Sequence, residues 1–219
     1  MTSGIEEIAL RLSRELSSSR VLVAIDGPDG SGKTTFAHRL ARQFDRRPTI
    51  VVHVDDFLNP SKLRYARGRS SPEGFWLDSY NYDALRTHVL DPLSCEGVAW
   101  YRPSCYDSAN DTEHLVDPVL APSDAVVLVE GLFLHRDELV RRWDASVFLD
   151  VPFAETARRM AIRDGSHSDP DHASMRRYVG GQRIYYAAAR PWERATLVVD
   201  NTSNVPRVID PCQVSAMLG

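Results

Sequence analysis

One glycine-rich segment carries the residues whose chemistry is easiest to interpret. Gly27-Pro-Asp-Gly-Ser-Gly-Lys33-Thr34-Thr35 follows the apolar run 21–26 and fits the spacing G-x-x-x-x-G-K-[ST]. Its glycines allow successive backbone N–H groups to turn inward and surround anionic oxygens. Lys33 can reach the terminal phosphates of a nucleoside triphosphate, and the Thr34 hydroxyl can join the ligands of Mg²⁺. The residues expected to bind the triphosphate are Gly27, Asp29, Gly30, Ser31, Gly32, Lys33, Thr34 and Thr35.

Acidic residues end two further apolar runs. The run 49–54 leads into Asp55 and Asp56, and the run 126–129 leads into Glu130. A carboxylate at the end of the run 49–54 could accept the proton of a hydroxyl that attacks the γ-phosphate, or hold the Mg²⁺ hydration shell. Because side chains alternate along a strand, we expect only one of the two aspartates to face the nucleotide. Glu130 is expected beside the metal, through water.

The order of apolar and amphipathic segments indicates an α/β fold. Near-continuous apolar runs of strand length are typical of strands buried on both faces, and they occur at 21–26, 49–54, 125–130, 145–150 and 195–200. Helical patterns alternate with several of them, at 33–44, 82–90, 153–163 and 174–189, and another precedes the first run at 5–16. This alternation predicts a parallel central sheet with helices on both faces. Two polar segments depart from it: 59–74 is expected to be a mobile loop, and 164–173 a short lid.

Length and charge limit the classes of protein that remain. The 219 residues fit one domain, 1–219, with a lid at about 164–173 and a substrate-side insertion at about 58–110. A net charge of −4 is unlike that of a duplex-binding protein, so we expect no nucleic-acid partner. The apolar runs are far shorter than the ~20 residues of a membrane helix, which predicts no membrane partner. Three cysteines without C-x-x-C spacing and no secretory leader favour a cytoplasmic protein.

Six motifs, in their order along the chain, resemble those of uridine kinases. They are Gly27–Thr35, Val54-Asp-Asp-Phe-Leu58, Val129-Glu-Gly-Leu132, Val147-Phe-Leu-Asp150, Arg158-Arg159 with Arg163-Asp164, and Arg177-Tyr178 with Arg190-Pro191. The resemblance covers about residues 21–201 and extends to the wider group that includes phosphoribulokinases and pantothenate kinases. It implies a P-loop NTPase fold and the Mg·ATP-dependent phosphorylation of a primary hydroxyl on a small metabolite, most closely a nucleoside.

The resemblance also implies roles for individual residues. The general base of the family matches Asp55, which would also lie near the metal, and its acidic residue after the middle strand matches Glu130. Lys33 and the lid arginine Arg163 would neutralise the transferred phosphoryl group. Arg159 matches a second lid arginine less closely, because three residues separate it from Arg163 where uridine kinases usually have two.

The residues expected to contact the acceptor match the family less well. The aspartate that binds ribose falls at Asp78 only if one residue has been deleted, and a tyrosine near the base resembles Tyr106. Asp111 or Asn110 stands where mammalian-type uridine kinases place a base-reading histidine.

Aromatic residues expected near the substrate cleft are Trp76, Tyr80, Tyr82, Trp100, Tyr101 and Tyr106, of which one or two could stack on a ring. The last long helix carries three basic residues, which we expect to be exposed to solvent in general: Arg176, Arg177 and Arg183. Arg183 is the one that we expect to turn inward and bind substrate.

The sequence leaves open alternatives for the acceptor and for the class of protein. The acceptor could instead be pantothenate, nicotinamide riboside, a sugar phosphate or an antibiotic. A nucleotide-dependent binding module is the alternative from another class, but the chain lacks the N-K-x-D segment of GTPase switches. The expected partners are ATP and one small acceptor, and the sequence leaves a homo-oligomer open.

Overall fold

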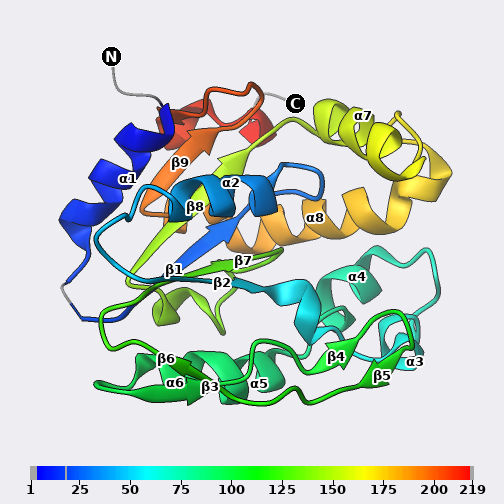
Figure 1. Cartoon of the computed structure of the whole chain (residues 1–219). Helices are drawn as coiled ribbons and strands as arrows, with labels where there is room; N and C mark the ends of the chain where they lie inside the picture. Colours follow the sequence, from blue (N-terminus) through cyan, green and yellow to red (C-terminus); the bar gives the residue numbers. More distant parts are fainter. Residues whose placement is uncertain (1–3, 18, 218–219) are drawn as a thin grey trace.

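A six-stranded sheet forms the centre of the computed structural model, which describes residues 4–17 and 19–217. The strand order is β10-β9-β8-β1-β7-β2, and every neighbouring pair is parallel except β10 with β9 (Figure 1). The strands are β1 (Val21–Asp26), β2 (Thr49–His53), β7 (Val126–Glu130), β8 (Ala145–Asp150), β9 (Leu197–Asp200) and β10 (Arg207–Ile209). The predicted parallel α/β sheet is therefore confirmed, with β10 as an additional antiparallel edge strand.

Helices cover both faces of this sheet because alternate residues of the central strands point to opposite sides. On one face, α1 (Gly4–Glu15) and α2 (Lys33–Ala41) pack on Val21, Val23 and Ile25 of β1. On the other face, Leu22 and Ala24 share a core with the segment 75–93 and with α8 (Arg176–Ala189). Burying each such aliphatic side chain contributes roughly 1.5–3 kcal/mol, which fixes the strands on which the site is built.

The chain between β2 and β7 forms a separate layer beside the sheet. It contains α3 (Ser61–Arg64), α4 (Pro72–Asp78), α5 (Tyr82–Leu85), the π-helical segment η2 (Arg86–Leu90), α6 (Asp91–Ser94) and two small antiparallel sheets. These sheets pair β3 (Ala99–Tyr101) with β6 (Val119–Ala121), and β4 (Tyr106–Asp107) with β5 (Thr112–Glu113). In Figure 1 this layer lies below the central sheet.

The prediction of a loop over 59–74 is wrong, because α3 and the start of α4 lie within it. The Ser71 side chain accepts a hydrogen bond from Gly74 N (3.0 Å), and Pro72 occupies the first helical turn. These are the signals of a helix start, although the segment is rich in residues that also favour loops.

The remaining elements are α7 (Phe153–Asp164), the segment that joins it to α8, and several short helices. α7 is joined to α8 by the segment 165–172 and by the 3-10 helix η4 (Ala173–Met175), so the predicted lid, 164–173, runs from the last residue of α7 to the first of η4. The short elements are η1 (Val54–Phe57), η3 (Val140–Arg142), α9 (Pro191–Arg194), η5 (Pro211–Gln213) and η6 (Ser215–Met217). No helix within the described residues has both the length and the apolar character needed to cross a membrane.

Candidate active site

The glycine-rich loop joins β1 to α2 at the carboxyl edge of the sheet. Gly30 (φ 76°) and Gly32 (φ 86°) have left-handed backbone conformations that favour glycine. A Cβ atom at Gly30 would also lie 2.8 Å from the carbonyl oxygen of Thr156. Because α2 begins at Lys33, the N–H groups of its first turn and its dipole favour an anion at the loop. Lys33 Nζ donates to the carbonyl oxygens of Gly27 (3.2 Å) and Pro28 (2.9 Å).

A buried carboxylate anchors the first residue of this loop. Asp26 has no exposed surface, and its Oδ1 accepts hydrogen bonds from Gly27 N (2.7 Å) and Phe133 N (3.2 Å). Its Oδ2 accepts one from the Tyr185 hydroxyl (2.5 Å) and lies 2.9 Å from His135 Nδ1. Asp26 is not among the site residues predicted from the sequence, although its position as an acid at the end of an apolar run and directly before Gly27 is a signal for such a role.

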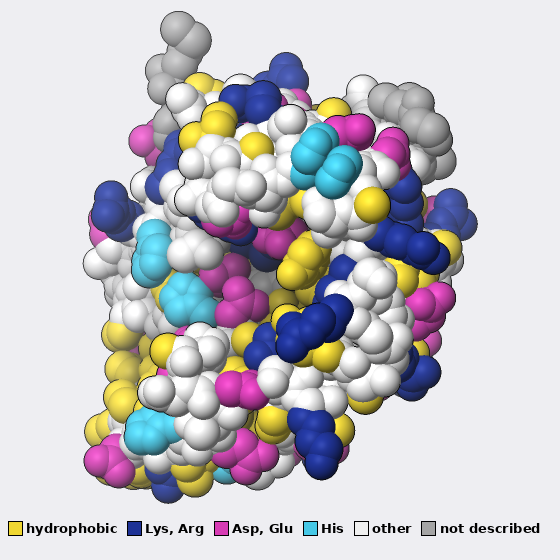
Figure 2. Space-filling view, turned by 90° about the vertical axis from the view of Figure 1, so that its right-hand side faces the viewer, with side chains coloured by type: hydrophobic (Ala, Val, Ile, Leu, Met, Phe, Trp, Pro, Cys, Tyr) yellow, Lys and Arg dark blue, Asp and Glu magenta, His cyan; other side chains and the backbone are white. Residues whose placement is uncertain are grey.

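A cavity of about 670 Å³ opens over the loop. Figure 2 shows it as a hollow near the middle of one face, with acidic side chains beside it. The residues that line it are Asp29, Gly30, Gly32, Lys33, Thr34, Thr35, Asp55, Asp56, Leu58, Phe75, Tyr80, Ser108, Glu130, Gly131, Leu132, Arg159, Met160 and Arg163. Most of the predicted nucleotide-binding residues and all of the predicted catalytic residues therefore meet at one cavity.

Both adjacent aspartates line the cavity, so the expectation that only one would face it is wrong. The reason is local, because β2 ends at His53 and Asp55 and Asp56 lie on the 3-10 helix η1. Side chains one residue apart on such a helix differ in direction by about 120° rather than the 180° of a strand. The cavity walls deprive both carboxylates of water and so raise the pKa of Asp55 and of Asp56.

Tyr80 holds Asp55 from the layer formed by the chain between β2 and β7, which is called the acceptor-side layer below after the prediction that it binds the acceptor. Its hydroxyl donates to Asp55 Oδ1 (2.9 Å), which opposes the effect of the cavity walls on the pKa of Asp55. Backbone bonds fix the two segments to each other: Asn59 N donates to Ser79 O (2.9 Å), and Asn81 N to Phe57 O (2.8 Å). Tyr80 was expected near the cleft from the sequence. Its contact with Asp55 depends on the pairing of the segments 57–59 and 79–81, which no local sequence pattern predicts.

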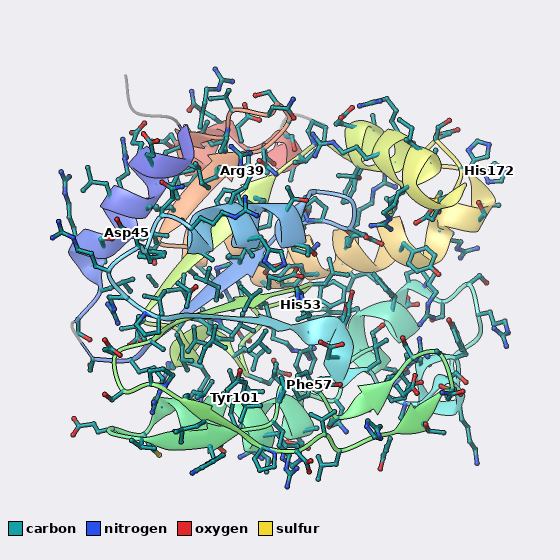
Figure 3. The ribbon with its side chains drawn as sticks, viewed as in Figure 1. Arg39, Asp45, His53, Phe57, Tyr101 and His172 are labelled. Carbon is teal, nitrogen blue, oxygen red and sulfur yellow. The ribbon has the colours of Figure 1, made fainter. Side chains whose placement is uncertain are left out.

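Glu130 and Thr34 form the pair that could hold a divalent cation. Thr34 Oγ1 donates to Glu130 Oε1 (2.8 Å), and His53 Nδ1 lies 2.6 Å from the same oxygen. Burial disfavours the Glu130 carboxylate, but His53, Lys33 and Thr34 together lower its pKa. The hydrogen bond to Glu130 raises the pKa of His53. Figure 3 labels His53 near the ends of β2 and β7.

The oxygen ligands of this pair suit Mg²⁺, which keeps several waters and binds through few protein groups and substrate phosphates. Across residues 4–17 and 19–217, no group of three or more His, Cys, Asp or Glu side chains is placed to enclose a metal. A Mg²⁺ site made of Thr34, Glu130, phosphate oxygens and water needs only two protein ligands, so it requires no such cluster.

Two of the predicted arginines line the cavity and one does not. Arg163 is 60% exposed, pairs with Asp164 (2.7 Å) and lies 3.8 Å from Asp29. Arg159 pairs with Glu155 (2.8 Å) and donates to the carbonyl oxygens of Asn201 (3.0 Å) and Thr202 (2.8 Å), beyond the last parallel strand.

Arg183 does not turn inward, so that prediction is wrong. Its guanidinium pairs with Asp171 of the lid (2.9 Å) outside the cavity. Arg177, expected to be exposed, is instead 4% exposed and donates to the carbonyl oxygens of Arg64 (2.8 Å) and Ser71 (3.3 Å). The inward face of α8 thus carries Arg177 and the buried Gln182, whose Oε1 accepts a hydrogen bond from Asp29 N (2.8 Å).

Two predicted acceptor contacts, Asp78 and Tyr106, do not line the cavity. Asp78 accepts a hydrogen bond from Arg67 Nε (2.8 Å). The Tyr106 hydroxyl bonds to Asp111 and accepts from Arg64 (3.2 Å), and Asp111 also accepts bonds from Ser61. The bonds of Tyr106 and Asp111 to Ser61 and Arg64 tie the β4–β5 hairpin to α3 and engage these four side chains with one another.

Comparison with known proteins places this geometry among kinases. No family model matches the chain. It is 28% identical over 151 residues to a uridine kinase from Brevibacillus brevis, and the match covers 66% of each chain. Among solved structures, a possible uridine kinase from Bacillus stearothermophilus aligns with a TM-score of 0.70 and 23% identity, covering 89% of this chain and 96% of that one.

The chain is uridine kinase-like in sequence and fold. A phosphoribulokinase from Rhodobacter spheroides aligns with a TM-score of 0.56 and 16% identity, covering 86% of this chain and 74% of that one. The fold expected from the glycine-rich loop, that of P-loop kinases, is therefore confirmed. The aligned part spans about two thirds of the length of the Brevibacillus relative.

Proposed function

We propose that the protein is a Mg·ATP-dependent phosphotransferase that adds the γ-phosphoryl group of ATP to a primary hydroxyl of a small molecule, with a nucleoside such as uridine or cytidine as the leading acceptor. The observation that carries the proposal is the presence of Lys33 and Asp55 in one cavity of about 670 Å³. That volume lies within the range typical of small-molecule sites, and it lies at the carboxyl edge of a parallel sheet.

The donor side would hold ATP through the loop and its helix. Inward N–H groups of 27–35 and the first turn of α2 would receive the β- and γ-phosphates. Lys33 would exchange its two carbonyl partners for phosphate oxygens. Arg163 is the most exposed cation of the cavity and lies next to the lid, so it can swing over the transferring group.

The acceptor hydroxyl would be placed against Asp55. As its oxygen bonds to the γ-phosphorus, the bond from phosphorus to the β–γ bridging oxygen breaks and ADP leaves, while the hydroxyl proton passes to Asp55. Tyr80 keeps Oδ1 in place, which leaves Oδ2 to face the hydroxyl. Lid closure over 164–173 would exclude water, which otherwise competes as acceptor.

Thr34 and Glu130 would hold Mg²⁺, which neutralises phosphate charge during transfer. Their ligand oxygens already lie within 2.8 Å of each other. Residues of the chain thus supply one hydroxyl and one carboxylate, and the phosphates and water supply the rest.

The sequence relatives named uridine kinase support a nucleoside as the acceptor. A structural relative is named phosphoribulokinase, so this fold alone does not identify the acceptor. The test is to incubate the protein with Mg·ATP and single acceptors and to measure ADP and the phosphorylated product. The proposal expects phosphorylation of a primary hydroxyl that disappears in Lys33→Ala. ADP formation that is independent of every acceptor would contradict it.

A further inference from the structure

The charges of the cavity are divided between its two sides. Its three cations, Lys33, Arg159 and Arg163, all belong to the loop, α2 and α7 on the nucleotide side. On the acceptor side, the lining side chains include Asp55, Asp56, Leu58, Phe75, Tyr80 and Ser108. Two carboxylates, apolar and aromatic groups and hydroxyls therefore meet the acceptor, and the described lining residues on this side include no Lys or Arg.

Nearby arginines do not alter this balance, because each is engaged elsewhere. Arg64 bonds to Tyr106 (3.2 Å) and lies 3.4 Å from Asp111. Arg67 pairs with Asp78 (2.8 Å). The buried Arg177 donates to backbone carbonyl oxygens of the segment 64–71. None of these three side chains lines the cavity.

Asp56 is the acidic side chain on this side that has no assigned task. Its carboxylate forms no hydrogen bond within the described part of the chain, whereas Asp55 is held by Tyr80 and Glu130 by Thr34 and His53. The backbone of Asp56 is fixed, since its carbonyl oxygen accepts a hydrogen bond from Cys105 N (3.1 Å). A carboxylate that extends from a fixed backbone at a cavity wall, with free acceptor atoms, can attract donors and cations, and it repels anions.

We propose that Asp56 determines acceptor specificity by charge: the acceptor carries no net negative charge, and anionic alcohols such as carboxylates and phosphate esters are excluded. This inference rests on the proposed kinase function and narrows its acceptor class. An anionic group about 5 Å from Asp56, at an effective dielectric near 20, would bind roughly 10²-fold less well than an uncharged one. Specificity would then come from a repulsive element as well as from attractive contacts.

The test uses acceptors that differ mainly in charge, namely panthenol with pantothenate, and 5-carbamoyluridine with 5-carboxyuridine, together with uridine. For each compound, kcat/KM is measured from ADP formation and confirmed by detecting the phosphorylated product. We expect the wild-type protein to favour the member without the carboxylate by at least ~10-fold in each pair it accepts. Asp56→Asn should reduce that preference by at least about 10-fold and leave the KM for ATP within about 3-fold.

Controls separate charge from folding and from the kinase assignment. Asp56→Glu should restore the preference, and Glu113→Gln, an exposed acid of the hairpin outside the cavity, should leave it unchanged. Preference for the anionic member, or an unchanged preference in a folded Asp56→Asn protein, would overturn the inference while the kinase function stands. If no acceptor is phosphorylated by a protein that binds ATP through Lys33, the kinase function fails and the inference fails with it.

Discussion

At Asp55, two opposing influences set the protonation of the expected general base. The walls of the cavity remove water and raise its pKa, and the hydrogen bond from Tyr80 lowers it. Only the ionised carboxylate can take the proton of an attacking hydroxyl. On balance the pKa of Asp55 is raised. As the pH is lowered, kcat/KM should therefore begin to fall at a higher pH than it would with a general base of ordinary aspartate pKa.

Tyr80→Phe tests this balance. Loss of the hydrogen bond raises the pKa of Asp55 further, so the acid limb of the pH profile should move to higher pH by roughly one unit. The ring should still pack on Phe133 and Tyr82. Measuring ADP formation against pH checks the shift, with Tyr82→Phe as the matched control that has no contact with Asp55. Coincident acid limbs for Tyr80→Phe and the wild-type protein would remove Tyr80 from this role.

Several site residues could be predicted because their signal is local. Lys33 and Thr34 occupy fixed positions in a short motif, and that motif determines the turn and the start of the next helix. Arg183 could not be placed in the same way, since the inward face of α8 depends on packing against other segments. The joint exposure of Asp55 and Asp56 to the cavity required knowledge that β2 ends at His53.

At the scale of elements, α8 connects the two sides of the cavity. Its Gln182 bonds to the loop at Asp29, and its Arg177 bonds to the last residue of α3 and to Ser71, directly before α4. The close approach of α8 to α4 needs glycine, because a Cβ atom at Gly181 would lie 2.8 Å from both Phe75 Cδ1 and the Pro72 carbonyl oxygen. The periodicity of the sequence predicted α8, but not its close packing against α4, whose first three residues belong to the predicted loop 59–74.

Gly181→Ala should therefore destabilise the protein, by about 1–3 kcal/mol, since the added methyl group overpacks a tight contact. The measurement is the free energy of unfolding in urea. Ala188→Ser, at an exposed position of the same helix, should change that free energy by less than about 0.5 kcal/mol. Equal stabilities of the two variants would show that α4 and α8 can separate without cost.

At the scale of the whole molecule, the parallel topology brings distant residues together. The carboxyl ends of β1, β2 and β7 lie side by side, so the loop, Asp55 and Glu130 share one edge although 75 positions separate Asp55 from Glu130 in the sequence (Figure 1). Five apolar runs were enough to predict the five parallel strands of this sheet, although not the edge strand β10, because strands buried on both faces have a distinctive composition. The acceptor-side layer was harder to predict, since its short helices and two-stranded sheets depend on contacts distant in sequence.

Ligand binding at this edge should stabilise the whole fold. At a concentration 100-fold above its dissociation constant, a ligand adds about 2.7 kcal/mol, or roughly 5–10 °C in Tm for a chain of this size. We expect Mg·ATP to produce that shift, and EDTA or Lys33→Ala to reduce it. Thermal unfolding followed by circular dichroism checks this, and an equal shift in Lys33→Ala would show that ATP binds elsewhere.

The central claim is that the loop binds ATP while Asp55 activates a hydroxyl in the same cavity. The most direct measurement compares Asp55→Asn with the wild-type protein in two assays, ATP affinity and acceptor-dependent ADP formation at saturating Mg·ATP. The account predicts an ATP affinity within about 3-fold and a turnover reduced at least ~10²-fold, the scale of general-base loss. Turnover close to that of the wild-type protein would show that another group, with Asp56 or Glu130 next in position, takes the proton.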